Sequence, residues 1–431
     1  MRSLVITVLI ILLLAGRAFS SDDDITMQDL MQEIRALKTK VSELEDKLTQ
    51  QARKSEKQEK VIARKAEKTE HIDTHILHKE DGGYRIPGGL KIDAGATFVG
   101  QFAVNPNESG TEEEQVLDGT YSIDIEIEKE IGENGLAFIH LESGEGNGLD
   151  LDEITTFSAV NRDAANTGSE VDVTEVWYEH GFLDNRFVIT GGKLDTTIYM
   201  DQNTVANDET SQFLSTIFRN SSAIDFPTGI NTWGFRTAFV PYDWIEIGTG
   251  IFDDDNDWED LLEDYFTFSQ VNIKPNLMDR EGNYRLYGWY DDSKHAKWSD
   301  PNTDTQSNFG FGTSCDQRVT DYLTLFGRFG WEDPDVSTVE WTWSSGFQLD
   351  GPLWKRDKDF IGCAIGMDIP SDEYGDSGAG YDDPEGHIEA YYSFYVNDHL
   401  SISPDYQFIW NPNGSNDDPI NIVGLRGQVD F

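Results

Sequence analysis

The chain has 431 residues, of which 80 are Asp or Glu and 33 are Lys or Arg, so its formal net charge at pH 7 is −47. Residues 1–78 hold equal numbers of acidic and basic side chains, so the whole acidic excess lies in residues 79–431. This charge excludes nucleic acid as a partner, because phosphate binding needs positive side chains. It attracts cations instead, although adaptation to a salty environment would produce the same composition.

The first 20 residues have the pattern of a secretory signal peptide. Arg2 precedes an almost wholly apolar stretch, residues 4–15, and Ala18 and Ser20 are small residues at the positions that signal peptidase reads. The apolar stretch is too short to span a membrane as a helix, and no other run approaches the roughly 20 residues required. If the protein lies in a membrane, it must cross as a closed β-barrel, in which every backbone group is hydrogen-bonded.

Residues 21–81 are predicted to form a periplasmic helix that assembles as a coiled coil. Apolar residues recur every three or four positions in a heptad seam, formed by Met27, Leu30, Ile34, Leu37, Val41, Leu44 and Leu48. A lone helix of this polarity would be marginal in water, so the seam favours a homo-oligomer. The residue types in the seam favour a two-stranded coiled coil, whereas attachment to a barrel protein favours a three-stranded one. A single helix that lies against the periplasmic mouth of the barrel is a further alternative.

From residue 82 onward the chain has the pattern of many short β-strands. Runs of alternating apolar and polar residues are separated by Gly, Asn, Asp and Pro, and the last run ends on Phe431. A surface hairpin of a soluble β-sandwich would show the same alternation, but one parity here is too polar to form a buried core. We therefore predict an all-β fold over residues 82–431, a transmembrane antiparallel barrel of about 16 strands preceded by the N-terminal coiled coil.

Three stretches resemble the carbohydrate-selective porin family of bacterial outer membranes (OprB type). They include Gly192-Lys193-Leu194-Asp195 with Asp201-Gln202-Asn203, then Gly282-Asn283-Tyr284-Arg285, then Glu389-Ala390-Tyr391-Tyr392 with Arg426 and Phe431. The resemblance covers most of residues 85–431 and implies an outer-membrane channel for passive diffusion of carbohydrates in a Gram-negative-type bacterium. The heptad segment departs from the family and is similar to the stalks that attach some porins to the cell wall.

The resemblance also implies that residues 195–225 form a loop that folds into the barrel and narrows the pore. An outward loop at the extracellular rim is the alternative. A short helix is expected over residues 208–218, with Phe213, Leu214 and Ile217 on one face. In the inward arrangement this apolar face packs on the wall, and the side chains that face the permeation path are Asp195, Asp201, Asn203, Asn207 and Asp208.

The alternate residues of each strand that are expected to face the barrel interior include planar hydrogen-bonding groups beside aromatic rings. Such groups suit sugars, which are neutral polyols with apolar C–H faces. The candidate pore-lining residues are Arg236, Glu246, Arg285, Tyr287, Trp289, Arg328, Glu389, Tyr391 and Arg426. Alternation alone does not bring them to one constriction. For any single one of them, the alternative is a solvated wall residue or a structural ion pair across strands.

No signature of an enzyme, a cofactor or a metal centre is found in the sequence. The motifs H-E-x-x-H and G-x-S-x-G are missing, and the eight His residues are scattered. Asp253, Asp255 and Asp257 alternate like the start of a calcium loop, but Trp258 occupies the position of the required Gly. Loose binding of divalent ions by this acidic loop stays open. Cys315 and Cys363 are predicted to be unpaired.

The expected partners are outer-membrane lipid, mono- and oligosaccharides, small cations and further copies of the chain, with a trimer favoured. A general cation-preferring porin is one alternative function. A tether that joins the outer membrane to the cell wall through the coiled coil is another.

Overall fold

The computed structural model describes residues 84–86, 89–107, 114–146, 148–163, 170–256, 258–259, 261, 263–302, 304–378 and 380–431. The predicted signal peptide (1–20) and coiled coil (21–81) lie outside these residues and stay predictions. None of the described helices is long and apolar enough to cross a membrane.

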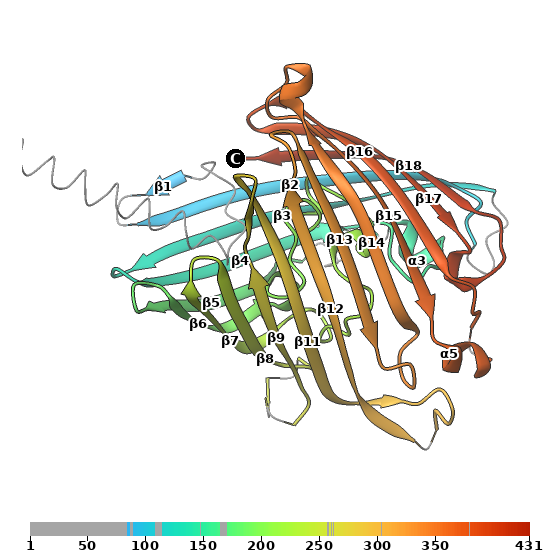
Figure 1. Cartoon of the computed structure of the whole chain (residues 1–431). Helices are drawn as coiled ribbons and strands as arrows, with labels where there is room; N and C mark the ends of the chain where they lie inside the picture. The colour runs from blue at the N-terminus through green and yellow to red at the C-terminus, as the bar shows by residue number, and fades with distance from the viewer. Residues whose placement is uncertain are drawn as a thin grey trace, which may run out of the picture. The chain divides into compact units, whose positions relative to one another are not determined.

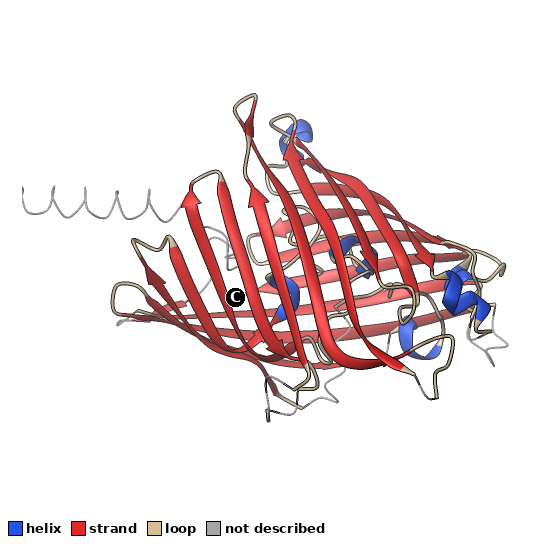
Figure 2. Ribbon diagram, turned by 60° about the horizontal axis from the view of Figure 1, so that its bottom comes forward, coloured by secondary structure: helices blue, strands red, loops and turns tan. Residues whose placement is uncertain are grey.

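The described chain is almost entirely β-structure (Figure 2). The strands are β1 (Tyr84–Ile86), β2 (Leu90–Val104), β3 (Gln115–Ile131), β4 (Gly135–Glu145), β5 (Asp172–Phe182), β6 (Phe187–Asp195), β7 (Asn231–Tyr242), β8 (Ile245–Asp253), β9 (Tyr265–Ile273), β10 (Asn276–Leu277), β11 (Arg280–Ala296), β12 (Thr305–Arg318), β13 (Leu323–Glu332), β14 (Val339–Asp350), β15 (Phe360–Pro370), β16 (Glu385–Asn397), β17 (Leu400–Trp410) and β18 (Ile420–Asp430). The helical segments are α3 (Leu149–Asp152), η1 (Thr196–Ile198), α4 (Thr216–Arg219), η2 (Gly351–Trp354), α5 (Asp372–Asp376) and η3 (Pro412–Gly414).

Sixteen of these strands close into an antiparallel barrel. Strands β2–β9 and β11–β18 each pair with their neighbours in sequence, β9 pairs with β11, and β18 pairs with β2. The 3-residue β1 and the 2-residue β10 pair with β2 and β11. The N–H of Phe431 donates to the carbonyl of Ala94, so the last residue continues the closing ladder. The predicted all-β barrel of about 16 strands is confirmed.

The connections differ between the two ends of the barrel (Figure 1). At the end with the C-terminus they are short, as in residues 132–134 and 398–399. At the other end they are long, and include residues 146–171, 196–230 and 371–384. Short turns at one end and longer loops at the other are the pattern of outer-membrane barrels, whose short turns lie on the periplasmic side.

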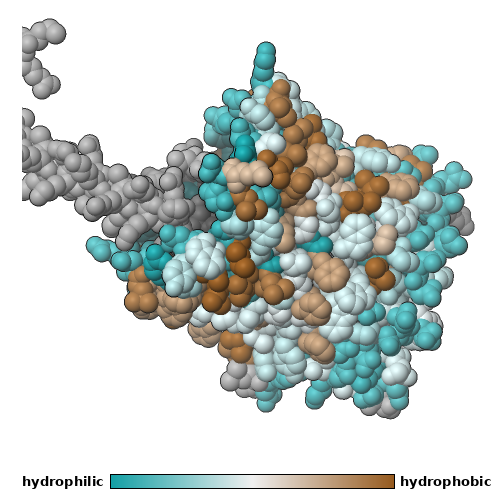
Figure 3. Space-filling model, viewed as in Figure 1, coloured by the Kyte–Doolittle hydropathy of each residue, from teal (hydrophilic) through white to brown (hydrophobic). Residues whose placement is uncertain are grey.

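The alternation in sequence becomes an inner and an outer face of the barrel. On β7, Phe235 is 54% exposed whereas the next residue, Arg236, is 2% exposed. On β18, Leu425 and Arg426 differ in the same way. Figure 3 shows brown, apolar side chains spread over the strands and teal, polar ones gathered over the loops. The apolar parity therefore faces outward, where a lipid bilayer would cover it, and the polar parity faces the interior.

The connection between β6 and β7, residues 196–230, folds into the barrel, where Figure 1 shows it in light green. Phe213, Ile217 and Phe218 of this inward loop pack on Phe326 and Tyr391 of the wall. Burying each large apolar side chain stabilises the loop by about 1.5–3 kcal/mol. The same contacts hold the loop against β13 and β16, so it narrows the interior instead of extending from the rim.

The helix expected over residues 208–218 is wrong, since only α4 (Thr216–Arg219) forms there. Asp208 accepts hydrogen bonds from the N–H and hydroxyl of Thr210. The Gln212 side chain accepts the N–H groups of Asn207 and Asp208. Side chains that satisfy nearby backbone groups compete with a helix, and here they produce a turn instead.

Candidate permeation site inside the barrel

Arg328, on β13, fixes the inward loop to the wall. Its Nε lies 3.1 Å from Asp201 Oδ2, and its Nη2 donates to the carbonyls of Asp201 and Ala206 at 3.0 and 2.8 Å. Its Nη1 donates to the carbonyl of Phe218. A guanidinium offers five donors in one plane, which suits several acceptors on one folded loop. Because Arg328 is only 4% exposed, it holds the loop and does not face open space.

Glu389 and Arg426 hold the middle of the inward loop in the same way. Glu389, on β16, accepts the N–H groups of Leu214 and Ser215 at 2.7 and 2.9 Å. Arg426, on β18, donates to the carbonyls of Glu209 and Gln212 at 2.6 and 2.7 Å. Both side chains are buried.

The remaining charged candidates on the wall are also paired. Arg285 lies 2.7 Å from Asp316, which in turn accepts the hydroxyl of Thr204 on the inward loop. Glu246 lies 2.8 Å from Lys274. Arg236 lies 3.7 Å from Glu179 and stacks over the ring of Tyr199 at 4.8 Å.

The candidate aromatic platforms lie beneath the inward loop. Tyr287 and Trp289 belong to a buried cluster with Tyr199 and Met200 of the loop, and the Trp289 indole N–H donates to the carbonyl of Ala223. Tyr391 packs edge-on against Phe213, with ring centroids 4.9 Å apart. These rings contribute apolar packing, and their faces are covered by the loop.

A second segment, residues 148–163 between β4 and β5, also packs inside the barrel. Its apolar side chains Leu149, Ile154 and Val160 are buried against β17 and β18. The N–H groups of Phe157 and Ser158 donate to the carboxylate of Glu385 on β16. Sequence reasoning missed this segment, although apolar residues in a connection that lacks strand alternation were an available signal.

The two infolded segments are joined to each other. The N–H of Arg162 donates to the carbonyl of Leu214, and the N–H of Thr216 donates to the carbonyl of Ala159, both at 2.9 Å. Asp150 closes the second segment by accepting the N–H groups of Val160 and Asn161. The interior is therefore narrowed by two segments that form one hydrogen-bonded unit.

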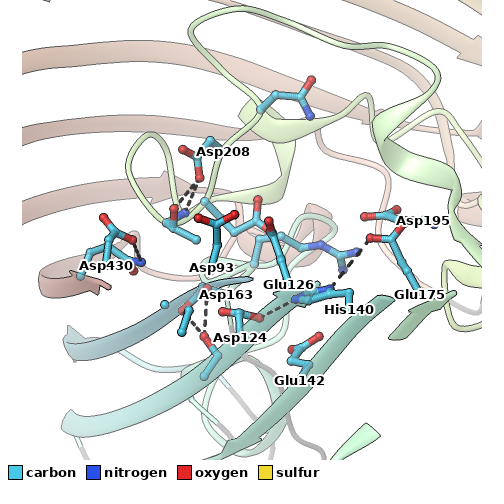
Figure 4. Close-up of a pocket in the computed structure, with 18 of the residues that line it drawn as sticks. Asp93, Asp124, Glu126, His140, Glu142, Asp163, Glu175, Asp195, Asp208 and Asp430 are labelled. Atoms are coloured by element: carbon cyan, nitrogen blue, oxygen red, sulfur yellow. Dashed lines mark hydrogen bonds and ion pairs between the residues drawn. The ribbon is translucent and has the colours of Figure 1, made fainter. Parts of the chain in front are cut away.

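A cavity of about 410 Å³ lies between these segments and the wall formed by β18 and β2–β6. Ten carboxylate side chains line it: Asp93, Asp124, Glu126, Glu142, Asp163, Glu175, Asp195, Asp208, Glu209 and Asp430. The basic side chains in the lining are Lys91, His140, Arg162 and Arg219. Figure 4 shows wall and loop carboxylates facing the same space. Carboxylates therefore outnumber basic side chains around the cavity.

Part of this negative charge is paired locally. His140 Nε2 lies 3.1 Å from Asp124 Oδ1 and its Nδ1 lies 3.9 Å from Glu175 Oε1. Lys91 lies 2.8 Å from Asp93, and Arg219 lies 2.5 Å from Glu209. The lining has more than twice as many carboxylates as basic groups, so these pairs leave a negative excess that faces the cavity.

Three of the fourteen candidate residues predicted from sequence, Asp195, Asn207 and Asp208, line this cavity. The other eleven face inward but lie outside its lining: Asp201, Asn203, Arg236, Glu246, Arg285, Tyr287, Trp289, Arg328, Glu389, Tyr391 and Arg426. Asn203, for example, donates to the hydroxyl of Ser314 on the wall. Contact of any of these residues with a permeating solute stays a prediction.

A closed 16-stranded barrel that is narrowed by an infolded loop is the architecture of a porin of the outer membrane. The sequence profile of the family described as "Carbohydrate-selective porin, OprB family" matches residues 110–431. The chain belongs to this family, as its motifs indicated. It is therefore an outer-membrane porin of the Gram-negative type and not an enzyme.

Solved structures support the same fold. The high-pH structure of Pseudomonas putida OprB has a TM-score of 0.67 at 18% identity, over 80% of this chain and 94% of that chain. Its low-pH structure has a TM-score of 0.51 at 16% identity, over 80% and 93% of the two chains. The outer-membrane channel DcaP of Acinetobacter baumannii has a TM-score of 0.50 at 9% identity, over 81% and 100%. No curated protein matches the chain.

Proposed function

We propose that this porin passes carbohydrates and small cations by passive diffusion, and that the acidic cavity is its selective region. Membership of a family described as carbohydrate-selective supports the sugar substrates. The cation preference rests on one observation, the ten carboxylates that line the cavity against three Lys or Arg side chains and one His. A narrow region lined by one sign of charge concentrates ions of the opposite sign.

The same lining suits the passage of neutral polyols. Carboxylates accept hydrogen bonds from sugar hydroxyl groups, while Arg162 and Arg219 offer donors from the two infolded segments. The aromatic rings that the sequence suggested as stacking platforms are buried, so hydrogen bonds are the main short-range contacts available to a sugar here. Such contacts must stay weak, because a channel has to release what it binds.

The cation preference is tested by neutralising Glu126 and Glu142 to Gln. A carboxylate about 4 Å from a permeating ion in water interacts with it by about 1 kcal/mol. Removing two carboxylates should therefore lower the cation-to-anion permeability ratio by about fivefold or more at low salt. Reversal potentials in planar bilayers under a salt gradient measure this ratio. Glu133→Gln, in an exposed periplasmic turn, is the control and should leave the ratio unchanged. Anion preference in the wild-type pore would contradict the proposal.

Liposome swelling with sugars and size-matched neutral solutes tests the carbohydrate preference. Faster entry of the sugars supports it. Rates that follow solute size alone would instead indicate a general cation-preferring porin.

A further inference from the structure

Asp225, Asp291 and His295 come together near the loop-bearing end of the barrel. Asp225 lies near the end of the inward loop, whereas the other two residues lie on β11. His295 Nε2 is 2.8 Å from Asp291 Oδ2, and His295 Nδ1 is 3.5 Å from Asp225 Oδ2. One ligand atom of each side chain lies within 4.8 Å of the others. The two carboxylates contact different ring nitrogens of His295, so binding of one ion by all three side chains requires the imidazole or a carboxylate to turn.

An irregularity in β11 creates this arrangement. Asp291 pairs with Asn308 and His295 pairs with Gln306, so four steps along β11 correspond to two steps along β12. In a regular strand, residues four apart are about 13 Å from each other. The bulge brings both side chains together and directs them toward the end of the inward loop.

The charges at this place are poorly balanced. Among the described residues, His295 is the one basic side chain that forms an ion pair with Asp225 or Asp291, and Asp291 is only 2% exposed. Asp254, on the connection after β8, adds a carboxylate that interacts electrostatically with Asp291. Buried carboxylates in proteins are normally paired with cations or coordinate metals.

We propose that Asp225, Asp291 and His295 bind a divalent metal ion of the zinc class, which fastens the end of the inward loop to β11. One imidazole nitrogen and two carboxylate oxygens suit zinc, with water as a fourth ligand. Calcium would require six to eight oxygen ligands and no imidazole. Asn308 donates its side-chain N–H to Asp225 at 3.0 Å and so orients one ligand.

This site departs from the sequence-based expectation that the chain holds no metal. The scattered His residues showed no metal-binding spacing, because one of the three ligands comes from a loop more than sixty residues away in sequence. The site is also independent of what permeates the pore, so its test does not depend on the proposed transport of sugars or cations.

Zinc binding to the full-length protein in detergent, after removal of metals with a chelator, tests the proposal. Isothermal titration with Zn²⁺ should show one bound ion more for the wild type than for His295→Gln. Asp225→Asn should weaken this site by at least about tenfold. His180→Gln is the matched control, because His180 contacts the hydroxyl of Tyr178, near the short-turn end of the barrel, and should bind as the wild type does. The difference in bound zinc between the His180→Gln and His295→Gln variants excludes zinc that other histidines bind, because both variants retain those histidines.

Hydrogen exchange of residues 220–230 provides a second readout. Zinc should slow exchange of this segment in the wild type and in His180→Gln, but not in His295→Gln. Heat-modifiable gel mobility establishes that each variant is folded, and Asp225→Asn serves for both readouts if His295→Gln does not fold. Equal zinc stoichiometry and affinity in the wild type and the folded variants would overturn the proposal and leave only an ion bridge between loop and wall.

Discussion

Arg328 shows how one side chain on the wall positions the inward loop. It bonds three loop carbonyls and the Asp201 carboxylate, and the side chains of this ion pair are 1% and 0% exposed. A buried pair adds little net stability compared with apolar residues, but losing one partner leaves an uncompensated charge. The sequence suggested that Arg328 faces the pore, whereas the structure shows that the loop covers it.

Replacing Arg328 with Ala should destabilise the folded barrel by about 3–5 kcal/mol and loosen the inward loop. Denaturant unfolding measures the stability, and protease cleavage within residues 196–230 measures the loosening. Arg186→Ala removes an exposed pair with Asp243 and should cost less than about 1 kcal/mol. Similar losses for the two variants would contradict the anchoring role of Arg328.

Asp150 gives the second infolded segment a dependence on pH. Burial raises the pKa of Asp150 to about 6, although the hydrogen bonds from two backbone N–H groups act in the opposite direction. Of the charged groups that face it, His387 lowers this pKa and Glu385 raises it. A raised pKa means that the folded state favours the protonated acid. The stability that protonated Asp150 contributes is complete below pH 3.8, the pKa of this group in the unfolded chain. It is lost as the pH rises through about 6, the pKa in the folded protein.

Opening of this segment should therefore become easier by on the order of 2 kcal/mol between pH 4 and pH 7. Hydrogen exchange at Val160 and Asn161, corrected for the intrinsic effect of pH, measures the opening. Asp150→Asn carries no titratable proton and should abolish this dependence. A dependence that survives in Asp150→Asn belongs to another group.

At the scale of elements, close contact between the inward loop and the strands depends on small residues in the wall. A Cβ on Gly366 of β15 would lie 2.9 Å from Ile217 and 3.2 Å from Phe218, so any larger residue would force these side chains of α4 to shift. On the outer face of β18, a Cβ on Gly427 would meet nothing within 4 Å. Wall glycines therefore include positions where the loop docks and positions where it does not.

Gly366→Val should displace α4 and cost about 1–3 kcal/mol through overpacking. The displaced loop should also change the single-channel conductance, which planar-bilayer recordings measure. Gly427→Val introduces the same side chain into a strand without a contact inside the barrel and serves as the control. An unchanged conductance in folded Gly366→Val would show that α4 does not limit the pore.

At the scale of the whole molecule, the closed ladder leaves no strand edge within the barrel exposed to lipid, since β18 pairs with β2 over ten residue pairs. The predicted oligomerisation through a coiled coil and the alternative function as a cell-wall tether both rest on the heptad pattern of residues 21–81, which lie outside the described structure. Oligomerisation through this segment stays a proposal that rests on its heptad seam.

Replacing Leu37, Val41 and Leu44 with Asp would place three unpaired charges in the predicted seam, at a cost of several kcal/mol. Chemical cross-linking in outer-membrane fractions should then yield monomers, whereas we expect trimers for the wild type. Substituting Glu43, Glu45 and Asp46, which lie outside the seam, with Gln or Asn should leave the cross-linked species unchanged. Trimers that persist in the seam variant would assign assembly to the barrel.

The class of fold and the inward-facing residues of several strands could be predicted from the amino-acid pattern alone. Alternation is a local property, so Arg236, Arg328 and Arg426 were correctly assigned to the inner face without knowledge of any tertiary contact. The apolar face of the strands and the family motifs together indicated an outer-membrane barrel of about 16 strands. β-strands can cross a lipid bilayer only as a closed barrel, because every backbone polar group must be hydrogen-bonded there.

Which inward side chains line the cavity depends on contacts that the strand pattern does not contain. Glu389 and Glu142 both lie on the inner wall, yet the first is buried under the loop and the second lines the cavity. The difference arises from where two long connections dock, and docking depends on contacts between residues that are distant in sequence. The contact between Asp225 and His295 also depends on tertiary structure. These residues come together only when the inward loop has docked and the bulge of β11 has formed, and strand alternation predicts neither.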